Sequence, residues 1–230
     1  MMDTFEDIIH KLITDADKPL SDILGSHYLA DYEALNNTEV SYQDVSLTEL
    51  LKKQAELTPN NIALEFHETK TTYQELHQKV NQLAHYLKAQ GVQSGDIIAV
   101  SVSRSPELLY TLLAIMQCGA AYLPLDPEYP KGRLEFMLND SGAKVLLTSK
   151  TLFASLPSWP ITLFIEDAME SLNHYDASPL SFVVSPDSMA YILYTSGSTG
   201  NPKGVPITNK NLVNLLCSMA LEPGISENDR

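Results

Sequence analysis

Short apolar runs alternate with helical patterns along the middle of this 230-residue chain. Residues 97–102, 121–125 and 144–148 have the length and composition of buried strands. A helix between the first two runs is indicated by Ser105-Pro106-Glu107, because serine caps a helix and proline favours its first turn. Strands that alternate with helices pair in parallel. The pattern therefore predicts an α/β fold in which helices flank a mostly parallel sheet.

Two sequences with the pattern of a capping box predict further helices. Ser46-Leu47-Thr48-Glu49 and Thr72-Tyr73-Gln74-Glu75 each place a hydroxyl three residues before a carboxylate. Capping alone explains Glu75, so we expect it to have a structural and not a catalytic role. A third cap, at Thr208, predicts a last helix that carries Leu212, Leu215, Leu216 and Met219.

Several other segments have weaker patterns. Residues 62–66 and those around Thr71 indicate two short strands joined by a polar turn, and residues 161–166 indicate one more strand. Residues 167–186 are polar and rich in turn formers, which is typical of a surface connection.

Residues 1–45 are expected to form a separate part of the chain. An amphipathic helix is predicted at its start, where Phe5, Ile8, Ile9, Leu12 and Ile13 recur at helical spacing. The apolar stripe either packs on the rest of this protein or docks on another protein. Residues 15–45 have the composition of a connector, so we expect the folded body to occupy residues 46–230.

A loop with the composition of a phosphate-binding site follows the apolar run 189–194. It reads Thr-Ser-Gly-Ser-Thr-Gly-Asn-Pro-Lys-Gly from Thr195 to Gly204. Glycines let backbone N–H groups approach an anion, while hydroxyls and a lysine add hydrogen bonds and positive charge. In α/β proteins such loops bind ligands beyond the ends of strands.

Two alternatives for the loop are less consistent with its sequence. A Walker loop counted from Gly197 requires glycine at Pro202 and serine or threonine at Gly204. A solvent-exposed Gly/Ser linker is rarely preceded by so apolar a strand and seldom ends in Pro-Lys-Gly.

Three motifs, in order, resemble those of the AMP-forming adenylating enzymes, which include acyl-CoA synthetases, luciferases and the adenylation domains of nonribosomal peptide synthetases. The loop at 194–204 resembles the signature loop of the superfamily, and residues 72–76 (Thr-Tyr-Gln-Glu-Leu) are similar to its early Thr-Tyr-x-Glu-Leu motif. Residues 119–130 (Gly-Ala-Ala-Tyr-Leu-Pro-Leu-Asp-Pro-Glu-Tyr-Pro), followed by Arg133-Leu134 and Asp140-Ser141, resemble the adenylation-domain version. The resemblance covers residues 47–230, and an acyl-CoA synthetase fragment remains the nearest alternative.

The resemblance implies a domain assignment and a reaction. Residues 1–45 resemble the segment after a condensation domain, and residues 46–230 the first half of the large N-terminal domain of an adenylation domain, truncated after the phosphate loop. Members convert a carboxylate and ATP to an acyl-adenylate and pyrophosphate, for later thioester transfer to a phosphopantetheine carrier domain. The expected partners are ATP with Mg²⁺, an amino or aryl acid, and condensation and carrier domains.

The resemblance also assigns roles to residues of the loop. Lys203 is the expected catalytic residue and would close over the phosphates. The expected phosphate-binding residues are Thr195, Ser196, Gly197, Ser198, Thr199, Gly200 and Lys203. Asn209 stands where many members have histidine, and we assign it no functional role. Because the purine site, the acid pocket and a second catalytic lysine lie beyond this point in the family, we expect the 230-residue chain alone to be inactive. A non-catalytic nucleotide-binding or docking module is the other alternative.

Charge and composition limit the remaining classes. Twenty-nine acidic against 15 basic residues give a formal charge of −14, which argues against nucleic acid or an anionic membrane as the main partner. No apolar run approaches ~20 residues and the N-terminus is acidic, so we expect a cytoplasmic protein. Cys118 and Cys217 are expected to be buried free thiols, and the histidines do not have the spacing of metal ligands.

For the turn after residue 125 we expect an ion pair between Asp126 and Arg133, with substrate contact as the alternative.

Overall fold

The computed structural model describes residues 2–19, 33–196 and 202–225. The chain divides into two compact units, Met1–Tyr42 and Gln43–Arg230. In the first unit, helix α1 (Met2–Thr14) confirms the amphipathic helix that the apolar spacing predicts. Its Ile9, Leu12 and Ile13 side chains are exposed to solvent, and Lys11 pairs with Asp7 one turn away.

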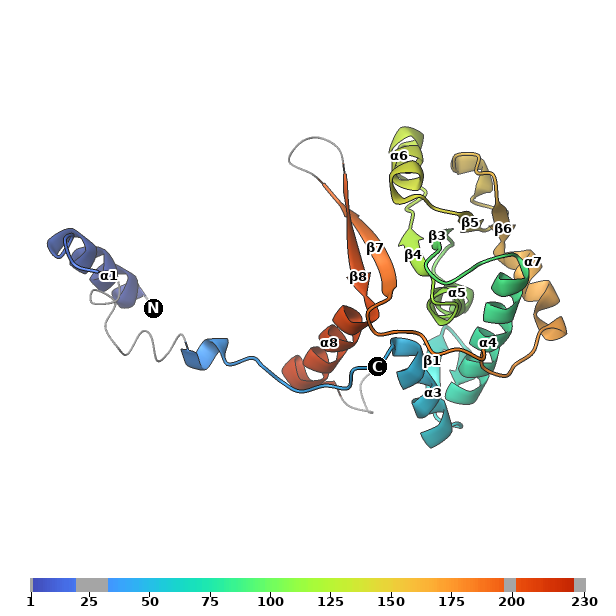
Figure 1. Ribbon diagram of the computed structural model, residues 1–230, viewed down its shortest axis with the longest axis horizontal. Coiled ribbons are helices and arrows are strands. Elements are labelled where there is room, and N and C mark those ends of the chain that lie inside the picture. The colour runs from blue at the N-terminus through green and yellow to red at the C-terminus, as the bar shows by residue number, and fades with distance from the viewer. Residues whose placement is uncertain (1, 20–32, 197–201, 226–230) are drawn as a thin grey trace. The chain divides into compact units, whose positions relative to one another are not determined.

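A six-stranded sheet forms the centre of the second unit, in the strand order β6-β5-β3-β4-β7-β8 (Figure 1). The first five strands in that order pair in parallel, and β8 is antiparallel to β7. The predicted mostly parallel sheet is therefore confirmed. The strands are β3 (Ile97–Ser101), β4 (Ala121–Pro124), β5 (Val145–Thr148), β6 (Thr162–Phe164), β7 (Met189–Thr195) and β8 (Lys203–Thr208).

Helices flank this sheet, and a separate two-stranded hairpin precedes it. The hairpin consists of β1 (Ile62–Phe66) and β2 (Thr69–Thr72), which pair in antiparallel fashion as the sequence predicts. The helices of this unit include α3 (Leu47–Leu57), α4 (Tyr73–Ala89), α5 (Pro106–Gln117), α6 (Lys131–Ser141), α7 (Ile165–Ser171) and α8 (Asn209–Met219).

The predicted side-chain caps begin four of these helices, α3, α4, α5 and α8. At α4 the Thr72 hydroxyl accepts a hydrogen bond from the Glu75 N–H at 3.2 Å, and the Glu75 carboxylate accepts one from the Thr72 N–H at 2.8 Å. This complete capping box gives Glu75 a structural role, as expected. At α3 the Ser46 hydroxyl accepts from the Glu49 N–H at 3.3 Å, which is one half of the predicted box.

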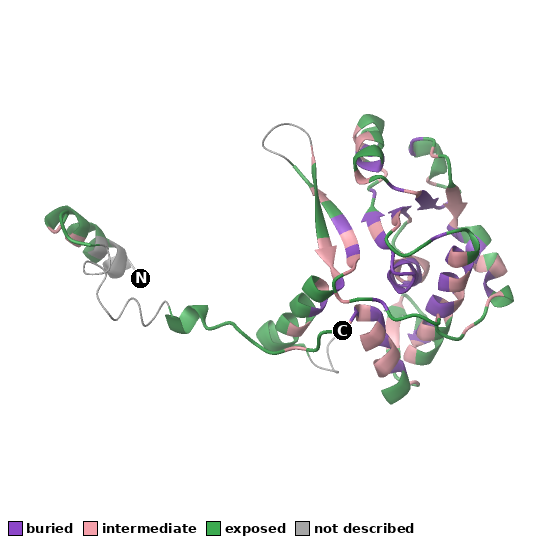
Figure 2. Ribbon diagram, in the orientation of Figure 1, coloured by how far each residue is buried: buried purple, intermediate pink, exposed green. Residues whose placement is uncertain are grey.

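Successive residues of the central strands face two different cores. Ile98 and Val100 of β3 pack with α4, α5 and α7, whereas Ala99 between them packs with α6 on the other face. Because both faces are covered, the central strands lack the polar alternation of a solvent-facing sheet. Buried residues accordingly gather in the central strands and in α5 (Figure 2).

The structure corrects the prediction for residues 161–186. The strand ends at Phe164, and Ile165 and Glu166 belong to α7, so the segment is not simply a polar surface connection. Ile165, Ala168 and Leu172 follow one another at helical spacing and are buried. Their burial against the core outweighs the turn-forming composition around them.

The turn after β4 is held differently from our prediction. The described residues show no ion pair between Asp126 and Arg133. Instead the Asp126 carboxylate accepts a hydrogen bond from the Glu128 N–H at 2.9 Å, and the Arg133 guanidinium lies 4.1 Å from the centre of the Tyr129 ring. A local Asx turn and a cation–π contact thus fix this turn.

Candidate functional site

The candidate phosphate loop joins the two strands of a hairpin. Thr195, the last residue of β7, is the Cα partner of Lys203, the first residue of β8, and Tyr194 is the partner of Gly204. The loop therefore runs from one strand into another, whereas a Walker loop runs into a helix. Of the predicted site residues, Gly197, Ser198, Thr199 and Gly200 lie outside the described residues.

Sequence reasoning missed strand β8. Val205 and Ile207 alternate with Gly204 and Pro206, a weak strand signal that the proline obscures. Proline is tolerated here because, in the described sheet, β8 pairs only with β7 and forms the edge.

Sheet topology puts the loop of this hairpin at the carboxyl end of the parallel strands, where α/β proteins bind ligands. Strand β7 runs parallel to β4, with Tyr191 opposite Tyr122, so the carboxyl ends of both strands lie side by side. Helix α5 follows β3 and packs in the core on one face of the sheet, whereas α6 follows β4 and packs in the core on the other face. Neighbouring crossovers that leave on opposite faces create a crevice beyond the carboxyl ends of their strands.

Three predicted site residues meet at the base of the loop. Thr195 and Ser196 on one side and Lys203 on the other are all exposed to solvent. Among the described residues, Lys203 forms no ion pair. The outer part of the hairpin is exposed, whereas Ala190 and Ile192 in β7 are buried (Figure 2). Two hydroxyls and an unpaired cation at an exposed, glycine-containing loop fit a phosphate group and not an apolar ligand.

Tyr194 adds a contact that sequence reasoning missed. Its hydroxyl donates a hydrogen bond to Oδ2 of Asp140 in the last turn of α6, at 2.6 Å. Its ring meets that of Phe136 edge to face, with 6.5 Å between the ring centres. Burial, together with the bond to the Asp140 carboxylate, raises the pKa of Tyr194. The available signal was that both residues lie within the motifs quoted above, although nothing in those motifs pairs them.

Two pockets of the described structure lie away from the hairpin. One, of about 360 Å³, lies beyond the carboxyl ends of β3, β5 and β6, and its lining contains Glu107 and Glu166 but no basic side chain. Its charge does not suit a phosphate. The other, of about 170 Å³, has Lys52, His77 and Gln117 in its lining. Gln117 is the last residue of α5, so this pocket lies near the amino ends of the strands. Burial lowers the pKa of His77 there.

Within the described residues, no three His, Cys, Asp or Glu side chains are grouped so that they could hold a metal ion. None of the helices described is both long and apolar enough to span a bilayer. Cys118 is buried as expected, but Cys217 is only half-buried.

Solved structures similar to this chain include nonribosomal peptide synthetase proteins. The N-terminal subdomain of NpsA from Klebsiella oxytoca superposes with a TM-score of 0.68 at 30% sequence identity, covering 76% of this chain and 44% of that one. The nonribosomal peptide synthetase FmoA3 superposes with a TM-score of 0.80 at 28% identity, covering 100% of this chain and 25% of that one.

Similar sequences include further proteins of this class. The dimodular nonribosomal peptide synthase of Bacillus subtilis (strain 168) is 40% identical over 199 residues, which are 85% of this chain and 8% of that protein. Gramicidin S synthase 2 of Brevibacillus brevis is 38% identical over 182 residues, 79% of this chain and 4% of that protein. The chain thus spans a small part of these relatives. Since the AMP-binding enzyme family matches residues 51–230, this chain belongs to that family.

Proposed function

We propose that this chain is part of an amino-acid-activating adenylation domain of a nonribosomal peptide synthetase, and that the β7–β8 loop binds the β- and γ-phosphates of ATP. The observation that carries the proposal is the pairing of Thr195 with Lys203 across the hairpin, at the carboxyl end of the sheet. In the parent protein the reaction would join a carboxylate to AMP and release pyrophosphate. The domain assignment, 1–45 as a connector and 46–230 as the adenylation part, belongs to the same proposal.

Each described residue has a chemical task in this proposal. The Thr195 and Ser196 hydroxyls donate hydrogen bonds to phosphate oxygens from one stem of the hairpin, and the Lys203 ammonium approaches from the other. Lys203 thereby offsets the negative charge that builds up on the leaving pyrophosphate. ATP brings Mg²⁺ with it, which neutralises part of the phosphate charge. We assign no carboxylate ligand for that ion, since the described residues hold no suitable acidic cluster.

Relatives support the choice of ligand and partners. The NpsA N-terminal subdomain is known in complex with 3-hydroxyanthranilyl-AMSN, and FmoA3 is known in an AMPPNP-bound form. NpsA has also been studied as an artificial fusion of adenylation and carrier domains with ThdA. By analogy, the parent of this chain would take ATP and an amino or aryl acid, and pass the product to a phosphopantetheine carrier domain.

Phosphate binding by the loop is tested by titrating ATP with Mg²⁺ into the 230-residue chain in a calorimeter. Lys203→Ala removes a charge-assisted contact worth about 1.5–3 kcal/mol, and exposure favours the lower value, so we expect affinity to fall about tenfold. Lys70→Ala is the matched control, because Lys70 is also an exposed lysine on a hairpin strand and lies in the separate β1–β2 hairpin. Equal affinities of the two variants would refute the assignment of Lys203.

Amino-acid activation needs a complete adenylation domain. A chimera would carry residues 51–230 in place of the matching region of the dimodular Bacillus subtilis synthase, and amino-acid-dependent exchange of pyrophosphate into ATP would be measured. We expect exchange that Lys203→Ala abolishes and Lys70→Ala does not. A folded chimera that binds ATP without any exchange would favour the non-catalytic module instead.

A further inference from the structure

One aromatic side chain contacts both stems of the candidate phosphate loop. Tyr194 directly precedes Thr195 in β7, and it lies opposite Gly204, which directly follows Lys203 in β8. A Cβ atom added to Gly204 would lie 3.1 Å from Cζ of the Tyr194 ring. The ring therefore occupies the space beside the β8 backbone, and its position is coupled to both strands.

The far end of the same side chain is tied to α6. The bond from the Tyr194 hydroxyl to Asp140 measures 2.6 Å, and an ionised acceptor makes such a bond stronger than one between neutral groups. Helix α6 is itself fixed, because Leu134, Met137 and Leu138 are almost fully buried in the core beneath the sheet. Asp140 thus offers the hairpin an attachment point on a rigid element.

We propose that Tyr194 and Asp140 are positioning residues, which anchor the two stems of the phosphate loop to α6 and hold Thr195 and Lys203 at a fixed distance from the carboxyl end of β4. The inference rests on the proposed function in that the loop is taken to bind phosphate. Neither residue touches the phosphate. They act by restricting where the stems can lie before a ligand arrives.

The anchor has a measurable consequence for binding. If a fraction of molecules holds the stems in the binding geometry, the apparent dissociation constant rises in inverse proportion to that fraction. Loss of the hydroxyl bond leaves the ring against Gly204 but lets it move away from α6. We expect the binding-competent fraction to fall about tenfold, equivalent to about 1.4 kcal/mol.

Amide hydrogen exchange in the 230-residue chain tests the anchor without any ligand. Tyr194→Phe and Asp140→Ala should each speed exchange about tenfold in peptides covering 189–195 and 203–208, and not in β3 or α5, because local opening of the stems becomes easier. Asp140→Asn keeps an oxygen acceptor and should restore part of the protection.

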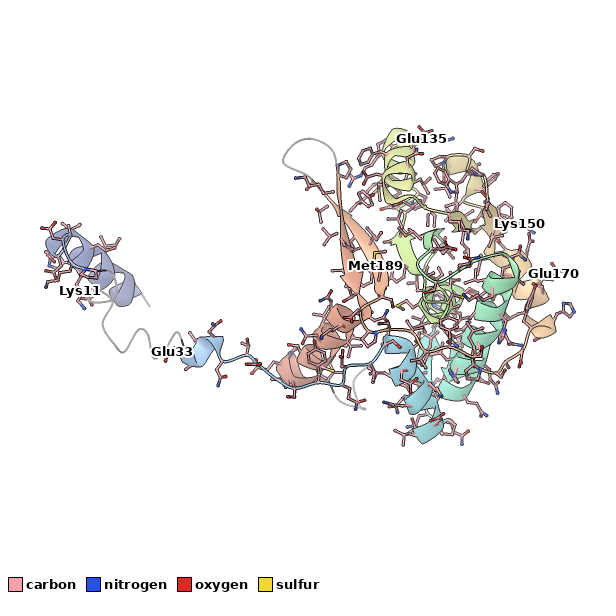
Figure 3. All side chains as sticks on the ribbon, in the orientation of Figure 1. Lys11, Glu33, Glu135, Lys150, Glu170 and Met189 are labelled. Carbon is pink, nitrogen blue, oxygen red and sulfur yellow. The ribbon has the colours of Figure 1, made fainter. Side chains whose placement is uncertain are left out.

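Two matched variants control for general effects. Tyr191→Phe removes a hydroxyl from the same strand, but the Tyr191 ring stacks on Tyr122 with 5.3 Å between centres, away from α6. Glu135→Ala removes a carboxylate from α6, where Glu135 projects from the helix (Figure 3). Exchange at the stems should be unchanged in both. Unchanged exchange in Tyr194→Phe, or equal acceleration throughout the sheet, would overturn the anchor.

Titration of the same variants with Mg²⁺ and inorganic tripolyphosphate separates the anchor from the proposed function. Weaker binding by Tyr194→Phe and Asp140→Ala, with normal binding by the controls, supports both ideas. Absence of binding by the unaltered chain, together with faster exchange at the stems, contradicts the proposed function and supports the anchor. Normal binding by all variants would show that the anchor does not position the loop and would overturn the inference.

Discussion

Replacement of Gly204 by alanine tests how tightly the hairpin is packed at the base of the loop. An added Cβ would lie 3.1 Å from Cγ2 of Ile192 and 3.1 Å from Cζ of Tyr194. Neither neighbour can move freely, because Ile192 is in a core and the Tyr194 hydroxyl is bonded to Asp140. We therefore expect Gly204→Ala to destabilise the chain, although alanine suits a strand better than glycine.

The magnitude follows from two opposing effects. Overpacking costs about 1–3 kcal/mol, while replacing glycine in a strand gains about 0.5–1 kcal/mol from the lower entropy of the unfolded chain. The expected net loss is about 1 kcal/mol, or about 2–4 °C in the midpoint of thermal unfolding for a chain of this length. In a Tyr194→Phe background the ring can shift, so the loss should shrink by about 0.5 kcal/mol or more.

Urea and thermal unfolding of the four proteins of this double-mutant cycle measure the effect. Gly132→Ala is the control, because nothing lies within 4 Å of a Cβ at Gly132 in α6, so this change should be neutral or stabilising. If Gly204→Ala also stabilises the chain, or costs the same with and without the Tyr194 hydroxyl, the packing argument is wrong.

Three further predictions concern other parts of the chain. Burial raises the pKa of the Cys118 thiol to about 12, so a thiol reagent at pH 8 should label the half-buried Cys217 much faster, and mass spectrometry should find both labelled only after unfolding. Hydrogen bonds from the Thr72 backbone and hydroxyl lower the pKa of Glu75 below its ordinary value of 4.5. The ionised carboxylate therefore stabilises the fold above pH 4.5, and this contribution is lost as the pH falls through the lowered pKa. The unfolding midpoint of Glu75→Gln should depend less on pH below about 4.5 than that of the unaltered chain, and an equal dependence would contradict this. With ATP, Mg²⁺ and the twenty amino acids, the isolated chain should release no pyrophosphate above background, because without positioning of the acid the reaction barrier is about 7–11 kcal/mol higher. Pyrophosphate release that Lys203→Ala abolishes would instead show that the chain is a complete small ligase.

Features encoded within a few residues could be predicted from the sequence. The capping box at Thr72 and the serine cap at Ser105 involve donors and acceptors three residues apart, so their pattern is visible without the fold. Strand and helix alternation likewise predicted the parallel sheet, because a crossover leaves the chain little choice of direction.

Features that depend on long-range pairing were missed or misjudged. Arg133 has both an acidic and an aromatic neighbour in the sequence, and only the geometry of the turn shows that it stacks on Tyr129. Tyr194 and Asp140 are 54 residues apart and meet because α6 and β7 flank the same core. The Asn81 amide of α4 donates to the Ala177 carbonyl at 2.7 Å and so holds a segment that we expected to be a surface connection.

The arrangement of the candidate site could be predicted from the sequence only in part. The composition of the loop indicated phosphate chemistry, and the residues at its two ends, Ser196 and Lys203, lie on the same exposed hairpin end. Its anchoring could not be predicted, because the register of β7 against β8 decides which residue lies opposite Tyr194.

Asn209 ties together segments made at different times during synthesis. Its buried side chain accepts a hydrogen bond from the Leu47 N–H at 3.4 Å and donates to the Ser188 carbonyl at 3.2 Å, so the start of α3 meets a residue 162 positions later. Contacts between such distant residues form late, because a long loop must close first. On the ribosome, α3 therefore emerges well before Asn209, and until Asn209 is synthesised the Leu47 N–H lacks the acceptor that it has in the folded chain.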